Sequence, residues 1–172
     1  MTIDKERVIM RQIFEFYKPS GFTVFWSSII SPTEGTMTIE CQPNKFTFTL
    51  IRDFSTLIKY TEKDDYVEII GRKIPIECSS WKKWPLFFIL NGKYYTHKFN
   101  KLYLFKYKLH NSIVCDGKEI ADIYYTINSQ LLFFKTGGRI RMELDNGIPF
   151  LEPLFYCIAW WWTGYFIDDT SS

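Results

Sequence analysis

Apolar and polar residues alternate along most of this 172-residue chain, in short runs separated by turn-forming residues. The clearest run is 36–42, where Met37, Ile39 and Cys41 fall on one face and polar residues on the other. A period of two is the pattern of a half-buried β-strand. About ten to twelve such runs at turn-punctuated spacing predict an antiparallel β-barrel or sandwich.

Turn-forming dipeptides locate the hairpins. Asn91-Gly92 and Asp116-Gly117 supply residues that tolerate the positive φ angles of a two-residue turn, and Gly137-Gly138 predicts a third such turn. Pro75 would confine its strand to a sheet edge, because proline cannot donate to a ladder. The predicted strands are 22–30, 36–42, 46–50, 56–60, 66–70, 73–78, 86–90, 93–99, 102–107, 113–115, 119–127, 131–135 and 139–144.

Two segments have a helical pattern instead. Apolar residues share one face of residues 4–17, which predicts a short N-terminal amphipathic helix. Residues 148–167 are nearly all apolar and carry one charge, Glu152. The uncharged part is shorter than the ~20 residues that span a bilayer, so we expect no transmembrane span. A helix that is apolar all round predicts a barrel closed about a core helix at about 150–167.

Three adjacent tryptophans in this helix, Trp160, Trp161 and Trp162, point around much of its circumference. Two interpretations remain open. The barrel encloses the helix, or the tryptophans form an apolar surface that docks into a protein partner or a membrane.

Net charge is only +2, but the charges are unevenly distributed. Between Glu77 and Asp116 there is no acidic residue, whereas the segment holds seven lysines interleaved with aromatic residues that include Trp81 and Trp84. Lysines near an anionic bilayer contribute ~1 kcal/mol each, and aromatic rings favour the headgroup level. The predicted binding residues are Lys82, Lys83, Lys93, Lys98, Lys101, Lys106 and Lys108, with Trp81, Trp84 and the three helix tryptophans as interaction residues.

Catalytic and metal chemistry have little support in the sequence. No nucleophile, zinc-protease or phosphate-loop motif is present, and His97 and His110 stand without sequence neighbours of catalytic type, with His110 expected in a turn. Gly137-Gly138 before Arg139 has two interpretations, a phosphate cradle of backbone N–H groups or a simple hairpin turn. We expect no enzyme activity, no cofactor and no metal.

The four cysteines form no CxxC pair and the N-terminus has no apolar signal core. We therefore expect free thiols in a cytoplasmic protein, either dissolved or peripheral at a membrane.

Two parts of the sequence resemble the tubby C-terminal-like superfamily. The first is the segment 116–123 (Asp-Gly-Lys-Glu-Ile-Ala-Asp-Ile), and the second is the strand 139–144 that leads through Asp145-Asn146-Gly147 into the apolar helix. That superfamily includes tubby domains, phospholipid scramblases and LURP-one-related proteins. The resemblance implies one domain over residues 1–172, a closed barrel of about a dozen strands threaded by the C-terminal helix. The bulky tryptophans depart from the small aliphatic residues expected there.

Two functions follow from these patterns. The first is a non-enzymatic module that binds anionic phospholipid or another small anionic ligand through the lysine-rich aromatic segment. The second is a structural or accessory subunit that buries its aromatic surface in a larger assembly. The same residues could stack on single-stranded nucleic acid, which is the less favoured partner. The remaining interpretation is a solvated strand face, whose lysines protect sheet edges.

Overall fold

The computed structural model describes residues 11–17, 27–42, 47–61, 65–78, 87–103, 108–126 and 139–170. They form twelve β-strands and one α-helix. The elements are β1 Gln12–Tyr17, β2 Ser28–Ser31, β3 Gly35–Gln42, β4 Thr47–Arg52, β5 Ser55–Thr61, β6 Tyr66–Ile69, β7 Arg72–Cys78, β8 Phe88–Leu90, β9 Lys93–Tyr103, β10 Lys108–Cys115, β11 Lys118–Thr126, β12 Arg139–Leu144 and α1 Leu151–Thr170.

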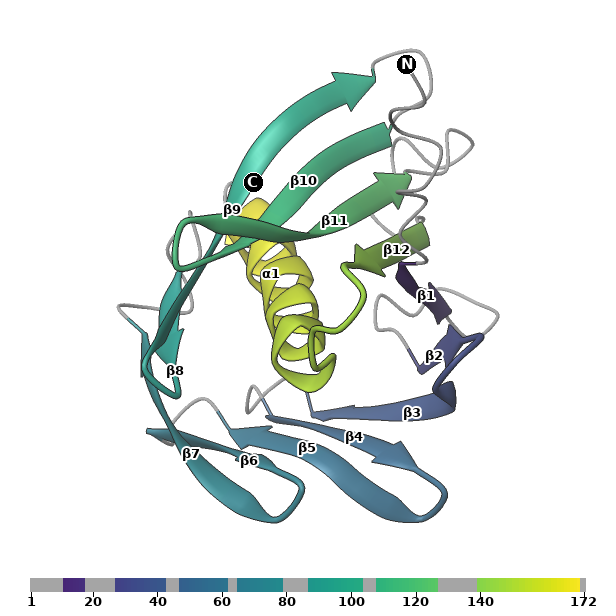
Figure 1. The fold of residues 1–172 in the computed structure, drawn as a ribbon, viewed down its shortest axis with the longest axis vertical. Helices are drawn as coiled ribbons and strands as arrows, with labels where there is room; N and C mark the ends of the chain where they lie inside the picture. The colour runs from purple at the N-terminus through teal and green to yellow at the C-terminus, as the bar shows by residue number, and fades with distance from the viewer. Residues whose placement is uncertain are drawn as a thin grey trace, which may run out of the picture.

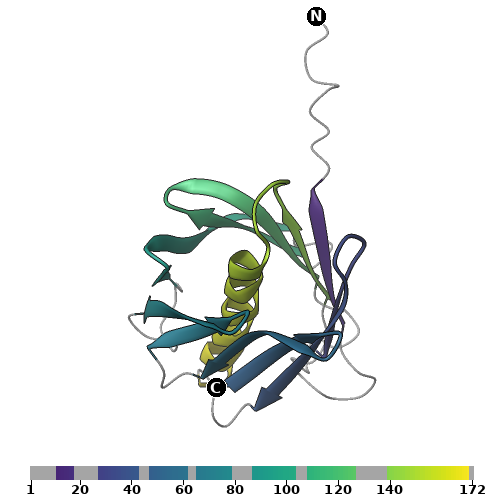
Figure 2. The ribbon, with the colours of Figure 1, turned by 60° about the horizontal axis from the view of Figure 1, so that its bottom comes forward.

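The strands form a closed antiparallel barrel around the helix. Each strand pairs with its neighbours in sequence, and β1 pairs with β12 through Phe14↔Met142 and adjacent residues (Figure 1). Figure 2 shows α1 inside the ring of strands. Among the described residues, every strand therefore has a neighbour on both sides. The predicted fold class, a β-barrel about a hydrophobic C-terminal helix, is confirmed.

Alternation along each strand divides the wall into an inner and an outer face. On β12, Ile140, Met142 and Leu144 are at most 1% exposed, whereas Arg141 and Glu143 between them are half-buried. The predicted alternation on β3 is confirmed as well, with the side chains of its apolar face inside. Apolar burial of this kind is the main favourable contribution to folding.

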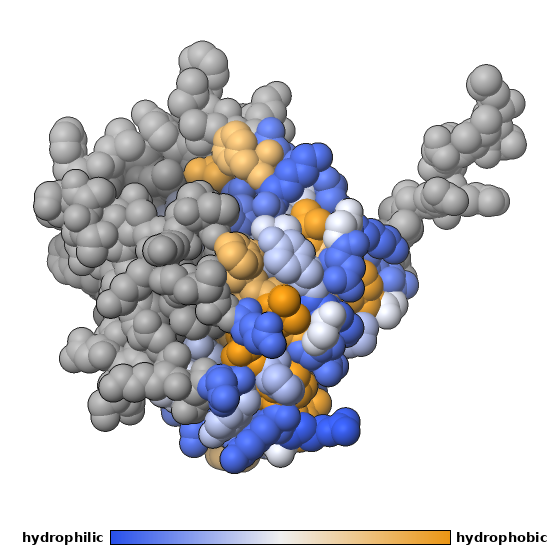
Figure 3. All heavy atoms as spheres, turned by 90° about the vertical axis from the view of Figure 1, so that its left-hand side faces the viewer, coloured by the Kyte–Doolittle hydropathy of each residue, from blue (hydrophilic) through white to orange (hydrophobic). Residues whose placement is uncertain are grey.

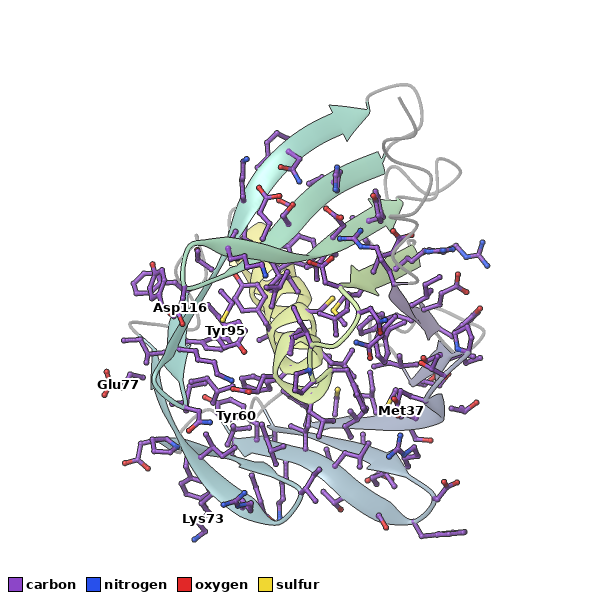
Figure 4. The ribbon with its side chains drawn as sticks, in the orientation of Figure 1. Met37, Tyr60, Lys73, Glu77, Tyr95 and Asp116 are labelled. Atoms are coloured by element: carbon purple, nitrogen blue, oxygen red, sulfur yellow. The ribbon has the colours of Figure 1, made fainter. Side chains whose placement is uncertain are left out.

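The helix fills the barrel because it is apolar on every side. Residues 154–160 are all buried, and the Phe155 ring contacts the rings of Phe48, Tyr60 and Phe88 at centroid distances of 5.3–5.6 Å. In Figure 4, Tyr60 lies toward the helix whereas Lys73 and Glu77 lie on the outside of the barrel. For residues 154–160, the enclosed alternative therefore holds.

The tight turns lie at one end of the barrel. Successive strands alternate in direction, so β2–β3, β4–β5, β6–β7, β8–β9 and β10–β11 all connect at the same end. Asn91 and Gly92 have φ angles of 53° and 75°, and Asp116 and Gly117 of 50° and 81°, as expected for the predicted turns. The chain enters α1 from this end, which we call the turn end, because β12 also finishes there.

The predicted N-terminal helix is wrong where the structure describes it. Residues 12–17 form β1, in which Phe14 and Phe16 are at most 3% exposed and Ile13, Glu15 and Tyr17 lie on the outer face. In so short a segment the spacing of apolar residues fits the helical period of about 3.6 residues as well as the strand period of two. Pairing with β2 and β12 decides in favour of the strand. Residues 4–10 of that prediction lie outside the described residues.

Pro75 does not mark a sheet edge, since β7 pairs with both β6 and β8. The Ile76 N–H donates to the carbonyl of Asp65 on the β6 side, so the ring nitrogen of Pro75 faces β8. The β7–β8 ladder ends at Ile76↔Leu90. Proline is tolerated at position 75 because its missing N–H would point toward β8 beyond the last residue pair of the β7–β8 ladder.

Two other strand predictions need correction. Residues 102 and 103 continue β9 instead of starting a new strand. In the β9–β10 ladder His110 pairs with Lys101 and Asn111 with Phe99, so Asn100 is an extra, unpaired residue in a β-bulge and the strand continues past it. His110 lies within β10 and not in a turn. The predicted strand 131–135 and most of 22–30 lie outside the described residues.

Candidate functional site

The structure describes only part of the predicted lysine and tryptophan set. Side chains are described for Lys93, Lys98 and Trp160. Lys101 and Lys108 lie in β9 and β10, opposite His110 and Tyr103, and Trp161 and Trp162 lie in α1. Outside the described residues are Trp81, Lys82, Lys83, Trp84 and Lys106.

Lys93 faces the inside of the barrel at the turn end. Its ammonium lies 3.1 Å from Oε2 of Glu152, in the first turn of α1, and the two side chains are 44% and 15% exposed. The neighbouring Tyr94 points outward and Tyr95 is buried, as alternation requires. Lys93, the first residue of β9, therefore connects the β8–β9 hairpin to the core helix. It lies on the opposite face of β9 from Lys98.

The outward side chains of β8 and β9 form a mixed apolar and basic surface. The Phe87 and Tyr94 rings have centroids 6.0 Å apart, and Tyr94 is the register partner of Ile89. Tyr94 is 42% and Ile89 38% exposed, large fractions for such side chains. Lys98 follows on the same side of β9. We call Phe87, Ile89, Tyr94 and Lys98 the outer β8–β9 face.

Figure 3 views the side of the barrel on which β8 and β9 lie, and its described part mixes apolar with hydrophilic side chains. Lys98 forms an ion pair with Glu119 at 3.1 Å, with side chains 62% and 51% exposed. An ion pair this open to solvent contributes ~0–1 kcal/mol. Glu119, which lies outside the acid-free stretch of the sequence, thus partly neutralises Lys98 in the folded protein. Phe99, 57% exposed, adds a further aromatic side chain to β9.

Trp160 does not belong to an exposed surface. It is 6% exposed, and its ring meets that of His97 edge-on at a centroid distance of 6.4 Å. One turn earlier in α1, Tyr156 Oη lies 2.7 Å from His97 Nδ1. His97, predicted on a strand face, thus faces the helix from β9.

A polar network on the outer face of β9 to β12 was not predicted. Nε2 of His110 lies 2.7 Å from Oδ1 of Asp122, the Ser112 hydroxyl donates to the same oxygen at 3.2 Å, and Asn100 donates to Ser112 Oγ at 2.6 Å. The Tyr124 ring stacks on His110 at 4.6 Å with an interplanar angle of 11°.

This network resembles a Ser-His-Asp triad only in composition. In a triad the serine bonds one ring nitrogen of histidine while the carboxylate bonds the other. Here Ser112 and His110 both bond the same carboxylate oxygen of Asp122, so His110 is not placed between the serine and the carboxylate as a triad histidine is. The geometry is that of a structural carboxylate held by several donors.

Arg11 extends the network to the β1–β12 seam. Its guanidinium binds Asp122 and Asp145, the latter at 3.0 Å, and lies 3.5 Å from Glu143. Burial raises the pKa of Asp122, but hydrogen bonds from His110 and Arg11 and the Arg11 charge outweigh it, so this pKa lies below its ordinary value. Arg11 precedes its carboxylate partners by more than a hundred residues, so local patterns could not reveal its place in the cluster.

Metal and membrane-span features are not found in the described part of the chain. Among these residues, no three His, Cys, Asp or Glu side chains are grouped to hold a metal ion. No helix among them combines the length and hydropathy of a membrane span.

The fold defines the class: a closed, twelve-stranded antiparallel barrel with its C-terminal helix as the core. Comparisons with protein-family models, curated proteins and solved structures gave no match.

Proposed function

We propose that this protein is a non-enzymatic binding module that docks on anionic phospholipid surfaces through the outer β8–β9 face. The observation that carries the proposal is the exposed pair Ile89 and Tyr94, packed with the half-buried Phe87, on the same face of the barrel as Lys98. Aromatic rings partition to the headgroup level of a bilayer, and basic side chains are attracted to its anionic lipids.

The electrostatics of the face permit this role. The Lys98–Glu119 pair is open to solvent, so exchanging the carboxylate for a lipid phosphate costs little. Lys93 is assigned elsewhere, because its partner Glu152 anchors it to the core helix. Lys101 lies in β9 and Lys108 in β10, and Trp81, Lys82, Lys83, Trp84 and Lys106 are close to β8, β9 or β10 in sequence. We include all seven in the proposed binding surface.

The resemblance to the tubby C-terminal-like superfamily adds support, since phospholipid scramblases are among its members. We extend the proposal to that membership, with the whole chain as one tubby-like domain working in the cytoplasm or at a membrane surface.

Vesicle co-sedimentation tests the proposal. The full chain is mixed with vesicles of phosphatidylcholine alone or with added phosphatidylserine, at 0.1 M and 1 M salt. We expect binding only to the anionic vesicles, and loss of it at high salt, where the screening length falls from ~10 Å to ~3 Å. Reversing two charges, Lys98→Glu with Lys101→Glu, should weaken binding while the melting temperature stays nearly unchanged.

A matched control reverses two lysines on other strands, Lys59→Glu with Lys73→Glu, and gives the same change in net charge. These side chains are exposed on β5 and β7. If the proposal is right, the control retains more binding than the Lys98 and Lys101 variant. Equal losses in both variants, or no binding to anionic vesicles, would contradict it.

The alternative, an accessory subunit that buries its aromatic surface in a protein partner, is favoured by the exposed Tyr94 of the same outer β8–β9 face. A stable stoichiometric partner that co-purifies with the wild type and is lost in Tyr94→Ser, together with absent vesicle binding, would establish it. An apolar protein interface of this kind would resist 1 M salt, unlike the lipid interaction.

A further inference from the structure

A hollow of about 440 Å³ opens where β1, β11 and β12 meet. It lies on different strands from the outer β8–β9 face and is independent of it. Small-molecule sites typically enclose ~300–1,000 Å³. We call it the β12 hollow, and its lining residues are Glu15, Phe16, Tyr17, Tyr124, Arg139, Ile140, Arg141 and Glu143.

Most charged groups of the β12 hollow hold one another. Nη1 of Arg141 donates to Glu15 at 3.2 Å and its Nε donates to Glu143 at 3.1 Å. The Tyr17 hydroxyl donates to the second oxygen of Glu15 at 2.8 Å. These contacts fix the wall of the hollow and use up both of its carboxylates.

Arg139 is the exception among the lining charges. Its side chain is exposed, and none of the described carboxylates lies within ion-pair distance of it. It precedes Arg141 by two residues on β12, so both guanidinium groups are on the outer face of the strand. Arg139 and Tyr17 both line the hollow. The hydrogen bond to Glu15 raises the pKa of Tyr17, and the Arg139 charge lowers it in part.

We propose that the β12 hollow binds a small molecule through a phosphate or carboxylate group held by Arg139. The guanidinium fork matches two oxygens of such a group, and charge-assisted bonds of this type are about twice as strong as neutral ones. The hollow has room for a body of several heavy atoms beyond the anionic group. Its walls are polar and pre-arranged by the Glu15–Arg141–Glu143 contacts.

Isothermal titration of the full chain tests the site with inorganic phosphate and with succinate, at constant ionic strength set by chloride. We expect saturable binding of at least one probe, and a loss of about tenfold or more in Arg139→Gln, since a hydrogen bond between charged groups has that value. The control Arg72→Gln removes an exposed charge from β7 and should bind as the wild type does. Both variants should have the melting temperature of the wild type, because both arginine side chains are exposed.

Vesicles containing phosphatidic acid separate a lipid headgroup from a soluble ligand. Binding to these vesicles that Arg139→Gln abolishes, without binding of either soluble probe, would assign the anion to a lipid and still support Arg139 as its partner. Equal affinities of the wild type and Arg139→Gln for every probe, or no binding of any probe, would overturn the proposal. The vesicle result for Lys98→Glu with Lys101→Glu is a separate readout, so failure here leaves the β8–β9 proposal untouched.

Discussion

His97 Nδ1 and Tyr156 Oη lie 2.7 Å apart and join the barrel wall to the core helix. Tyr156 is fully buried and also packs its ring near Phe88 and Tyr95. Together with the Lys93–Glu152 ion pair at the turn end, this contact joins polar groups of β9 to α1.

Replacing Tyr156 by phenylalanine keeps the ring and removes the hydroxyl. We expect the free energy of unfolding to fall by about 1–3 kcal/mol, because the partner atom of His97 loses its hydrogen bond in a largely buried site. Urea unfolding measures the loss. Tyr94→Phe, the same change on the exposed outer face, should alter it by less than about 0.5 kcal/mol. Equal stabilities of the wild type and Tyr156→Phe would show that the contact does not contribute.

Two lysine–glutamate pairs of equal length provide a test of burial. Lys93–Glu152 and Lys98–Glu119 both measure 3.1 Å, but Glu152 is 15% exposed and Glu119 is 51% exposed. We expect Lys93→Ala to cost about 1–3 kcal/mol, between the exposed limit of ~1 and the buried limit of ~3. The Lys98→Ala change should cost less than about 1 kcal/mol.

A double-mutant cycle isolates the pairwise energy, with Glu152→Gln and Glu119→Gln as second changes. The coupling energy of the Lys93 pair should exceed that of the Lys98 pair and should fall less between 0.1 M and 1 M salt, because burial limits screening. Identical coupling in both cycles would mean that the turn-end contact is no stronger than a surface pair.

Asp122 should make the protein sensitive to acid. Its pKa lies below the ordinary value in the folded state, so its contribution is complete above the unfolded value of ~3.9 and is lost as pH falls through the folded-state pKa. We expect Asp122→Asn to lower stability at pH 7 by about 1–3 kcal/mol. The difference from the wild type should shrink toward pH 2.

Glu119→Gln is the control for this pH series, since Glu119 is exposed and outside the network. Chemical denaturation at several pH values from 7 to 2 compares the three proteins. A constant difference between the wild type and Asp122→Asn across that range would indicate that the Asp122 charge is not what stabilises the seam.

The cysteines should be free thiols of unequal reactivity. Burial raises the pKa of the Cys157 thiol and raises that of Cys41 to about 11, and only the thiolate is reactive. We expect four thiols by Ellman titration in denaturant without reductant. In native protein Cys157, which is fully buried, should react most slowly.

Cys157→Ala is the matched variant for the thiol count. It should reduce the denatured count to three and leave the fast native phase unchanged. Fewer than four thiols in the denatured wild type would reveal a disulfide and contradict the expected reducing compartment.

Features that depend on local sequence were predictable. The Asn91-Gly92 turn follows from the φ angles its residues adopt, and alternation on β3 and β12 follows from the pleat. The core position of α1 follows from the absence of a polar face on residues 154–160.

Features that depend on long-range pairing were not. The segment of β1 fits a helical face as well as a strand face until β12 and β2 lie beside it. The lysine stretch looked uncompensated, yet Lys93 finds Glu152 fifty-nine residues later. Arg11 joins the His110–Asp122 contact only when the barrel closes, since it directly precedes β1 whereas His110 and Asp122 lie on the β10–β11 hairpin.

Closure between β1 and β12 and a C-terminal core helix have a consequence for biosynthesis. A ribosome releases Phe14 and Phe16 early, but their partners in β12 and the α1 side chains that fill the barrel are made more than a hundred residues later. Each hairpin can pair as it emerges, whereas the inner wall has no core helix to pack against until α1 has been made. The nascent chain therefore presents a long apolar surface until α1 emerges, and a stop codon before α1 would leave that surface permanently without its core.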